Sequence, residues 1–430
     1  MLRLLKVFFL VLASSLYADV YDFNLIKKGN DNNNTLLVVG GIQGDEPGGF
    51  LSASLLATHY TIEQGSVWIV PNLNFYSILQ RSRGPYGDMN RKFASIDRND
   101  PEFGTIQRIK HYIQDDTVKL VVNLHDGSGY YRPSYEDKCH APNRWGQCSI
   151  IDQKEIEIQE YGDLEFIANS VVKHVNSALL RPEDRYHLHN THTKQGNKEM
   201  EKTLTYYAIQ QGKAAFGNEA SKNLPTHERV YYHLLALERY MQIMGICYTR
   251  KFQLTPLGVY NVINNDISIS FYGGSISLPL GKIRDELHYF PIKKDEKLSF
   301  EASNPLLTLL PIKNGYAIHY GNRRLVNLST DSFEHQSINT TVDIEIDGEI
   351  QHVSFGTMLE VQKAFVVKPS KGFRINVIGF QSTQEDECDI KIYRSSIPSR
   401  FSIDKEGKIY RIEYYHDNKF AGMVLVKFVS

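Results

Sequence analysis

The stretch TLLVVGGIQGDE, residues 35–46, joins a run of apolar and β-branched residues to a glycine-rich turn that carries Gln43 and Glu46. Pro47 follows directly, and proline is favoured at the first position of a helix. The stretch therefore predicts a buried strand over Thr35–Val39, a tight turn and then a helix. Because only two residues separate Gln43 from Glu46, both side chains can reach one ion at the end of the strand. The alternative is an ordinary strand-to-helix turn with both side chains solvated.

The same alternation of strand and helix continues to about Ile243. Further buried strands are predicted over Ser66–Val70, Val118–Leu124 and Ala214–Asn218. Helical periodicity is strongest over about Glu157–Leu179 and Glu228–Ile243. This alternation is typical of an α/β domain. In open α/β sheets ligands bind beyond the carboxyl ends of the strands, so we expect functional side chains there.

His125 stands at one such strand end, in the sequence Leu-His-Asp-Gly after the strand Val118–Leu124. With Gln43 and Glu46 it completes a set of an amide, a carboxylate and an imidazole. Zinc usually takes imidazole, thiolate or carboxylate ligands, and a catalytic zinc keeps a further position open. The glutamine is the unusual member of this set. The alternative for His125 is a loop histidine that hydrogen-bonds backbone.

An arginine-rich segment lies between two of the predicted strands. It contains Arg81-Ser82-Arg83 and then Asp88-Met89-Asn90-Arg91. Arginine with a neighbouring asparagine can hold a carboxylate through forked, charge-assisted hydrogen bonds. A further arginine can stabilise the oxyanion that forms when water adds to an amide. The alternative is a solvated basic loop.

Glu219 lies at the end of the predicted strand Ala214–Asn218, in the sequence Phe-Gly-Asn-Glu. A carboxylate at this position can accept a proton from an attacking water and pass it to a leaving amine. The alternative is an acidic residue at a helix N-terminus, where the helix dipole favours a negative charge.

The chain as a whole has the composition of a folded protein. It has 430 residues, of which 42% are hydrophobic and 23% charged, and this length predicts two or three domains. The net charge of −1 provides no electrostatic basis for nucleic-acid binding, so we predict no nucleic-acid partner.

The first eighteen residues have the features of a secretory signal peptide. Arg3 and Lys6 precede an apolar run over Val7–Ala13, and small residues lead to Ala18. No later stretch stays apolar for eighteen residues, so we predict an exported chain without a transmembrane span in its mature form.

Four cysteines are compatible with an oxidising compartment. Cys139 and Cys148 flank a short loop that a disulfide can close, and the sequence leaves their pairing open. Cys247 and Cys388 are predicted to be buried thiols.

Beyond about Phe252 short alternating runs separated by Gly, Pro or Asn predict strands, the first of them Val259–Val262. Asp347-Gly348 between two alternating runs predicts a two-residue hairpin turn. The predicted organisation is therefore a signal peptide over 1–18 and an α/β domain over 19–250. A small β domain over 251–337 and a sandwich-like, immunoglobulin-like β domain over 338–430 follow.

Four motifs, in their order and spacing, carry a resemblance to a known family: residues 42–46, 88–91, 124–129 and 217–219. Together they resemble the funnelin-type zinc metallocarboxypeptidases. With glutamine at the first ligand position and β domains following, the chain is most similar to the periplasmic peptidoglycan D,L-carboxypeptidases that determine helical cell shape. The resemblance covers about residues 20–245 by motif and the remainder by architecture.

The resemblance implies a mixed-sheet carboxypeptidase domain with one Zn²⁺ ion, acting in the periplasm on peptidoglycan muropeptides. The expected reaction removes the terminal diaminopimelate from a muramyl tripeptide and leaves a dipeptide. The resemblance implies that Gln43, Glu46 and His125 bind the zinc ion and that Glu219 is the general base. It implies that Arg83 stabilises the oxyanion, with Arg81 as second choice. It further implies that Asn90 and Arg91 bind the substrate carboxylate and that Thr205 and Trp145 line the pocket. His187, His189 and His192 match no part of the family pattern and are expected to be solvated loop histidines.

Two other hypotheses remain open. The first is an N-acyl amino acid deacylase of the succinylglutamate or aspartate type, which shares Asn-Arg after an upstream arginine. Export and the added β domains argue against it. The second is a non-catalytic wall-binding protein that lost its metal when histidine was replaced by Gln43. The β domains are expected to orient the catalytic domain on the cell wall or to bind partner proteins.

Overall fold

The computed structural model describes residues 21–30, 33–294, 296, 298–336, 338, 340–382 and 386–429. The chain divides into two compact units. The first extends to Ile263 and includes Gly321–Arg323, and the second comprises Asn264–Tyr320 and the chain from Arg324 onward. The predicted signal peptide, 1–18, lies outside the described residues, and the domain divisions at 250/251 and 337/338 stay predictions. In the described part of the chain no helix is both long and apolar enough to span a bilayer.

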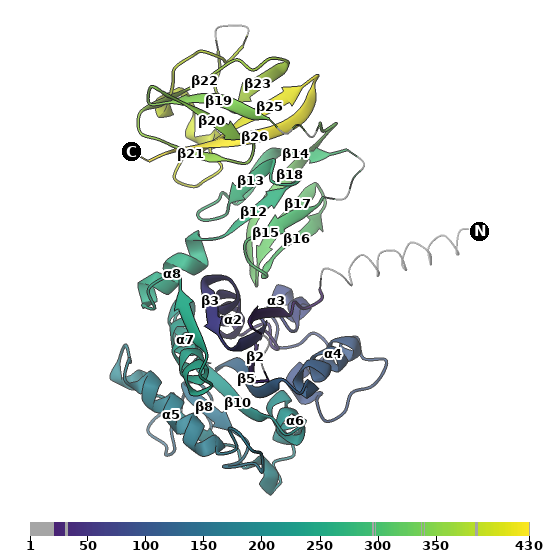
Figure 1. The fold of residues 1–430 in the computed structure, drawn as a ribbon, viewed down its shortest axis with the longest axis vertical. Helices are drawn as coiled ribbons and strands as arrows, with labels where there is room; N and C mark the ends of the chain where they lie inside the picture. Colours follow the sequence, from purple (N-terminus) through teal and green to yellow (C-terminus); the bar gives the residue numbers. More distant parts are fainter. Residues whose placement is uncertain are drawn as a thin grey trace, which may run out of the picture. The chain divides into compact units, whose positions relative to one another are not determined.

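The first unit is built on a seven-stranded mixed sheet, which confirms the predicted fold class (Figure 1). The strand order is β1 (Ile26–Gly29), β4 (Ser66–Val70), β2 (Thr35–Val39), β5 (Val118–Gly127), β10 (Ala214–Ser221), β8 (Cys148–Ile151) and β9 (His187–Asn190). The central strands β4, β2, β5 and β10 are parallel to one another. Strand β1 runs antiparallel to β4, and β8 runs antiparallel to β10.

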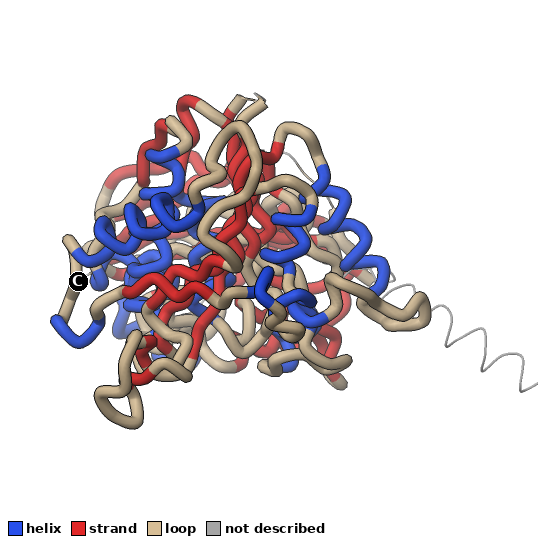
Figure 2. Tube along the Cα trace, turned by 90° about the horizontal axis from the view of Figure 1, so that it is seen from below, coloured by secondary structure: helices blue, strands red, loops and turns tan. Residues whose placement is uncertain are grey.

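Helices cover both faces of this sheet (Figure 2). Helices α2 (Pro47–His59), α5 (Leu164–Asn176) and α7 (Thr226–Ile243) pack together on one face. Helices α4 (Phe103–Gln114) and α6 (Leu204–Gln210) share an apolar core with β2, β4 and β5 on the other face. Every residue of β2 and of β4 is buried, as expected of parallel strands that are covered on both sides.

Shorter elements complete this unit. They are α3 (Phe75–Gln80), the 3₁₀ helix η1 (Met89–Arg91), the paired strands β3 (Tyr60–Gln64) and β11 (Cys247–Arg250), and α8 (Pro256–Asn265). The paired strands β6 (Tyr130–Tyr131) and β7 (His140–Ala141) and the 3₁₀ helices η2 (Pro182–Asp184), η3 (Thr193–Gln195) and η4 (Met200–Lys202) lie between the larger elements in sequence.

Over the residues that the structure describes, the second unit contains four small sheets. A three-stranded sheet contains β13 (Ile276–Pro279), β12 (Ser268–Phe271) and β15 (Phe300–Ala302), and a four-stranded sheet contains β14 (Glu286–Lys293), β18 (Arg323–Phe333), β17 (Gly315–Tyr320) and β16 (Leu307–Ile312). A third sheet contains β20 (Glu349–Ser354), β19 (Thr341–Ile346), β22 (Ala364–Val367) and β24 (Ile392–Tyr393). A fourth sheet contains β21 (Met358–Val361), β26 (Lys419–Phe428), β25 (Ile409–His416) and β23 (Phe373–Val377). The last two sheets bury one shared hydrophobic core, the arrangement of a β-sandwich.

The hairpin predicted at Asp347-Gly348 is confirmed. Ile346 pairs with Glu349 across the turn. Asp347 and Gly348 have φ angles of 54° and 103°, and positive φ at both central residues is the requirement of a type I′ turn.

Two sequence predictions are wrong. Val259–Val262 was expected as a strand because it is a short run bounded by Gly and Asn, yet it lies in helix α8, where Val259, Val262 and Ile263 are the buried positions. Their spacing of three and four residues is that of a helix face. The helix expected from Glu157 begins only at Leu164, because the side chain of Asp163 accepts a hydrogen bond from Phe166 N and caps it there.

The turn after β2 depends on close packing at Gly44. Gly44 N donates to Ser82 O at 2.9 Å and to Ser77 Oγ at 3.1 Å. A Cβ atom at this position would lie 2.0 Å from Ser77 O. The turn therefore requires glycine here, and it places Gln43 and Glu46 on either side of this contact.

We predict that Gly44→Ala destabilises the first unit by about 1–3 kcal/mol, the usual range for overpacking, because either the turn or the Ser77 backbone must move. Gly104→Ala in helix α4 is the control, since a Cβ there meets nothing within 4 Å. Urea unfolding followed by circular dichroism measures both. Equal stability of the two variants would contradict the proposed contact.

Candidate active site and metal centre

The three predicted ligand side chains meet at one point. His125 Nδ1 lies 3.1 Å from Gln43 Oε1 and 2.9 Å from Glu46 Oε2. All three residues are buried, with 1%, 3% and 6% of Gln43, Glu46 and His125 exposed. Among the described residues no group of three His, Cys, Asp or Glu is arranged to hold a metal. A metal centre at this point therefore needs the glutamine as a ligand.

The parallel register of the sheet explains this convergence. Glu219 on β10 is the register partner of His125 on β5, so their side chains leave the same face of adjacent strands. Strand β2 ends at Val39, which pairs with Asn123, and the following turn brings Gln43 and Glu46 to the same edge. Residues distant in sequence are thus placed together by the ends of three neighbouring parallel strands.

Asp88 fixes the orientation of the Gln43 amide. Gln43 Nε2 donates to Asp88 Oδ1 at 2.7 Å, which leaves Gln43 Oε1 facing His125. The same Asp88 oxygen accepts from Asn90 N at 3.0 Å. A carboxylate can only accept hydrogen bonds from these groups, so the Gln43 NH₂ group must face Asp88. The Gln43 oxygen, which is the better metal ligand, therefore faces the histidine.

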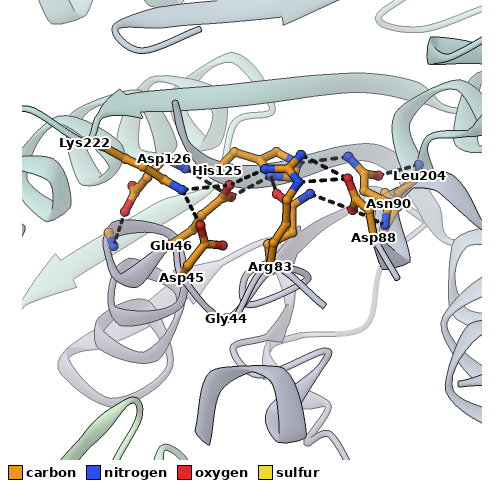
Figure 3. Close-up of polar contacts among 12 residues, drawn as sticks. Gly44, Asp45, Glu46, Arg83, Asp88, Asn90, His125, Asp126, Leu204 and Lys222 are labelled. Carbon is orange, nitrogen blue, oxygen red and sulfur yellow. Dashed lines mark hydrogen bonds and ion pairs between the residues drawn. The ribbon is translucent and has the colours of Figure 1, made fainter. Parts of the chain in front are cut away.

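A cavity of about 250 Å³ opens over this cluster. Its wall contains all nine residues predicted for the site, namely Gln43, Glu46, Arg83, Asn90, Arg91, His125, Trp145, Thr205 and Glu219. The wall also contains Lys222, Met200 and Thr203. Figure 3 shows the polar contacts that connect Lys222, Glu46, His125, Arg83 and Asn90 in one row.

Arg83 rather than Arg81 reaches the cavity. Arg83 lies 3.4 Å from Glu46 Oε1 and 3.0 Å from Asp88 Oδ2, with about half of its side chain exposed. Arg81 instead ends helix α3 with a φ of 53° and donates from Nε to Asn322 O at 2.6 Å. The geometry therefore favours Arg83 as the arginine that can contact a substrate.

Asn90 presents a donor to the site. Its Oδ1 accepts from Leu204 N at 3.0 Å, and its Nδ2 lies 3.4 Å from His125 Nε2. Because the oxygen is already engaged, the amide N–H group is the part directed inward. Arg91 lies beside it, with Nη1 donating to Asn90 O at 3.1 Å and a long ion pair to Glu199 at 3.7 Å.

Glu219 is buried beside the ligand cluster. Among the described residues no donor reaches its Oε2. Burial raises the pKa of Glu219 to about 8; the charge of His125 opposes this rise, and the negative charges of Glu46 and Asp126 add to it. For His125, burial acts to lower the pKa, but the hydrogen bond and charge of Glu46 outweigh burial and raise it.

A second layer of buried polar groups supports the His125 loop. Asp126 accepts from Gly48 N at 2.8 Å and from Arg229 Nη1 at 3.2 Å, and its Oδ1 lies 3.2 Å from His233 Nε2. His233 Nδ1 lies 2.9 Å from Asn218 Nδ2, next to Glu219. Sequence reasoning missed these residues and Asp88. Two signals in the sequence could have found them. Asp88 and Asp126 lie inside the motifs 88–91 and 124–129, and Arg229 and His233 are four residues apart on one predicted helix.

The histidines at 187 and 189 are not solvated loop residues, so that expectation is wrong for them. Both lie on strand β9. His189 stacks on Tyr131 at 4.0 Å between ring centroids and lies 4.8 Å from Trp145, and burial lowers its pKa to about 4. His192 lies outside the strand with a φ of 51°. His189 therefore packs against Trp145, which belongs to the cavity wall.

All four cysteines are free thiols, so the structure contains no disulfide between Cys139 and Cys148. Cys139 is exposed and Cys148 is buried, with Sγ donating to Trp145 O at 3.0 Å. Cys388 is buried as predicted, whereas Cys247 is exposed, which corrects the prediction for that residue.

The comparisons with known proteins agree with this geometry. A family model described as "carboxypeptidase controlling helical cell shape catalytic" matches residues 4–264. The chain belongs to this family. A second model, the C-terminal domain of metallo-carboxypeptidase, matches residues 335–429. The protein is therefore a metallocarboxypeptidase. No curated protein matches the chain.

Among solved structures the chain is similar to the cell shape determinant protein Csd4 from Helicobacter pylori. The apo structure of that protein has 41% sequence identity, covers 95% of this chain and 100% of its own, and gives a TM-score of 0.83. Its tripeptide-bound structure gives the same identity, coverage and TM-score. The mDAP-bound form, described as a D,L-carboxypeptidase, also has 41% identity, covers 94% of this chain and 100% of its own, and gives a TM-score of 0.83.

We predict that Glu219→Gln changes how the stability of the metal-free protein depends on pH. The pKa of the Glu219 carboxyl group is raised in the folded state to about 8, from an ordinary value of 4.5. Its protonated form therefore stabilises the fold, and this contribution is complete below about pH 4.5. That contribution is lost as the pH rises through 8. Wild type should therefore lose unfolding free energy relative to the variant over this window, measured by urea unfolding in chelator. Parallel pH curves would contradict the raised pKa.

Proposed function

We propose that the protein is a periplasmic zinc D,L-carboxypeptidase that removes the terminal diaminopimelate from peptidoglycan tripeptide stems and so influences cell shape. The observation that carries this proposal is the meeting of Gln43, Glu46 and His125 beside Glu219, whose Oε2 no donor reaches among the described residues. Family membership and the similarity to Csd4, which is described as a D,L-carboxypeptidase and has been solved with tripeptide and with mDAP, support the choice of substrate.

The donor set fits one divalent zinc ion. Gln43 Oε1, Glu46 Oε2 and His125 Nδ1 would hold it, because both oxygens lie within hydrogen-bond distance of the imidazole nitrogen. Zinc at this position supplies Lewis acidity toward the scissile carbonyl oxygen and toward water. Any cation held here also favours the carboxylate form of the neighbouring Glu219.

Each side chain around this position has a separate role in the proposed reaction. Glu219 takes a proton from the attacking water and passes it to the leaving amine. Arg83 donates to the oxyanion of the tetrahedral intermediate. Asn90 and Arg91 hold the terminal carboxylate of the substrate, and Thr205 and Trp145 shape the pocket around the leaving amino acid.

The histidine tautomer links metal binding to substrate binding. If Nδ1 of His125 faces the cation, its proton must reside on Nε2. Nε2 can then no longer accept from Asn90 Nδ2, which lies 3.4 Å away. The Asn90 amide is thereby left free to donate to the substrate carboxylate.

We predict that Glu219→Gln retains zinc and fold but lowers kcat on muramyl tripeptide by about 10²–10⁴-fold, the usual contribution of general acid–base catalysis. Glu160→Gln, at an exposed residue, is the control and should retain wild-type turnover. Release of diaminopimelate is measured by chromatography, with metal content measured in parallel. Wild-type turnover by Glu219→Gln would remove this residue from the base role.

The same assay separates the other two hypotheses. A deacylase would hydrolyse acetylaspartate or succinylglutamate in preference to muropeptides. A non-catalytic wall protein would contain no stoichiometric zinc after purification under zinc-replete conditions.

A second prediction concerns the unusual ligand. Gln43→His should bind zinc at least as tightly as wild type, because imidazole is a stronger zinc ligand than an amide. Gln43→Leu, which keeps the volume but removes both the oxygen and the donor to Asp88, should bind at least about tenfold more weakly. Chelator competition measures all three proteins. Wild-type affinity in Gln43→Leu would mean that Gln43 does not hold the metal.

A further inference from the structure

Lys222 is a cation in the cavity wall to which the proposed mechanism assigns no role. It lies just beyond the end of β10, three residues after Glu219, and its N donates to Gly127 O at 2.7 Å. Its Nζ donates to Asp45 Oδ2 at 2.6 Å and lies 3.7 Å from Glu46 Oε1. With 29% of its side chain exposed, the ammonium is held in place on one side and open to the cavity on the other.

The position of Lys222 relative to the other cations is informative. Figure 3 shows Lys222 and Asn90 at opposite ends of the row of polar contacts, with Glu46 and His125 between them. A substrate whose terminal carboxylate lies at Asn90 and Arg91, and whose scissile amide lies over the metal ligands, must extend its acyl side away from Asn90. Lys222 is the cationic residue of the described cavity wall at that far end.

The other two cations of the wall are already engaged near the middle and at the carboxylate end. Arg83 contacts Glu46 and Asp88, and Arg91 lies beside Asn90. A partly exposed ion pair such as Lys222 with Asp45 contributes little to stability. Fold stability alone is therefore a weak reason for a lysine at this point, whereas recognition of an anionic acyl group is a sufficient one.

We propose that Lys222 determines specificity by binding a free carboxylate on the acyl side of the scissile amide, an inference that rests on the proposed function. In a γ-linked glutamyl residue, the side-chain carboxyl forms the scissile amide and the α-carboxylate stays free. That carboxylate is four bonds from the scissile carbonyl carbon. A peptide linked through the α-carboxyl of an ordinary residue has no obligatory charge there. Lys222 thus selects γ-glutamyl substrates over α-linked peptides.

The test compares two substrates that differ in one group. The first is L-Ala-γ-D-Glu-diaminopimelate, and the second is the same tripeptide with the glutamyl α-carboxylate converted to a carboxamide. Both are assayed with the full-length zinc enzyme, as wild type, Lys222→Met and Lys222→Arg. Metal content and circular dichroism are recorded for each protein.

Wild type should favour the free acid by about tenfold in kcat/KM, the effect of one charge-assisted hydrogen bond. Lys222→Met should lose about this factor on the acid and change little on the carboxamide, whereas Lys222→Arg should retain the preference.

Equal turnover of both substrates by wild type overturns this inference and leaves the proposed function intact. Equal losses on both substrates in Lys222→Met, accompanied by metal loss, also overturn it, since Lys222 would then act through Glu46. Cleavage of neither substrate by wild type overturns the proposed function and the inference with it.

Discussion

The active-site geometry depends on the alignment of three parallel strand ends. β2, β5 and β10 are adjacent in the sheet, and their carboxyl ends lie at one edge. Register between strands is set by which side chains must face the buried core, and a slip of one residue would turn every side chain to the opposite face. The pairing of Glu219 with His125 is thus a consequence of the sheet rather than of any contact between the two side chains. The loops need only supply Gln43 and Glu46 from the neighbouring strand.

A glutamine in place of a charged or imidazole ligand, as proposed for Gln43, requires other residues to fix the orientation of its amide. An amide has two chemically different ends, and only its oxygen is a plausible donor to zinc. Asp88 resolves this ambiguity by accepting the Gln43 N–H group. Because Asp88 also holds the backbone of Asn90, the turn with the proposed ligand Gln43 and the segment proposed to bind the substrate carboxylate share one anchor. A disturbance of Asp88 would therefore reach both metal and substrate binding.

Much of the catalytic unit was predictable because its signals are local. The strands Thr35–Val39 and Ser66–Val70 have the predicted bounds, since continuous apolar runs flanked by glycine or polar residues leave little ambiguity. Gln43, Glu46, His125 and Glu219 could be singled out because they lie at or just after the ends of such strands, whereas Thr205 and Trp145 came only with the family resemblance. The supporting residues were not, because Arg229 and His233 belong to a helix whose pattern reads only as amphipathic. Helix α8 was misread as a strand because its short apolar run after Gly258 also matches the pattern of a short strand.

The balance of charge around the site indicates which carboxylate is reserved for chemistry. Burial acts to raise the pKa of Asp126, but the hydrogen bond from His233 and the charge of Arg229 outweigh it and hold the pKa below its usual value. Glu46 is surrounded by cationic or imidazole groups on several sides. Glu219 alone of these three acids has an oxygen that no donor reaches within the described chain. A buried carboxyl oxygen left without a donor costs stability, and such a cost is retained where an unengaged acceptor is needed, as it is for the proton-accepting role proposed for Glu219.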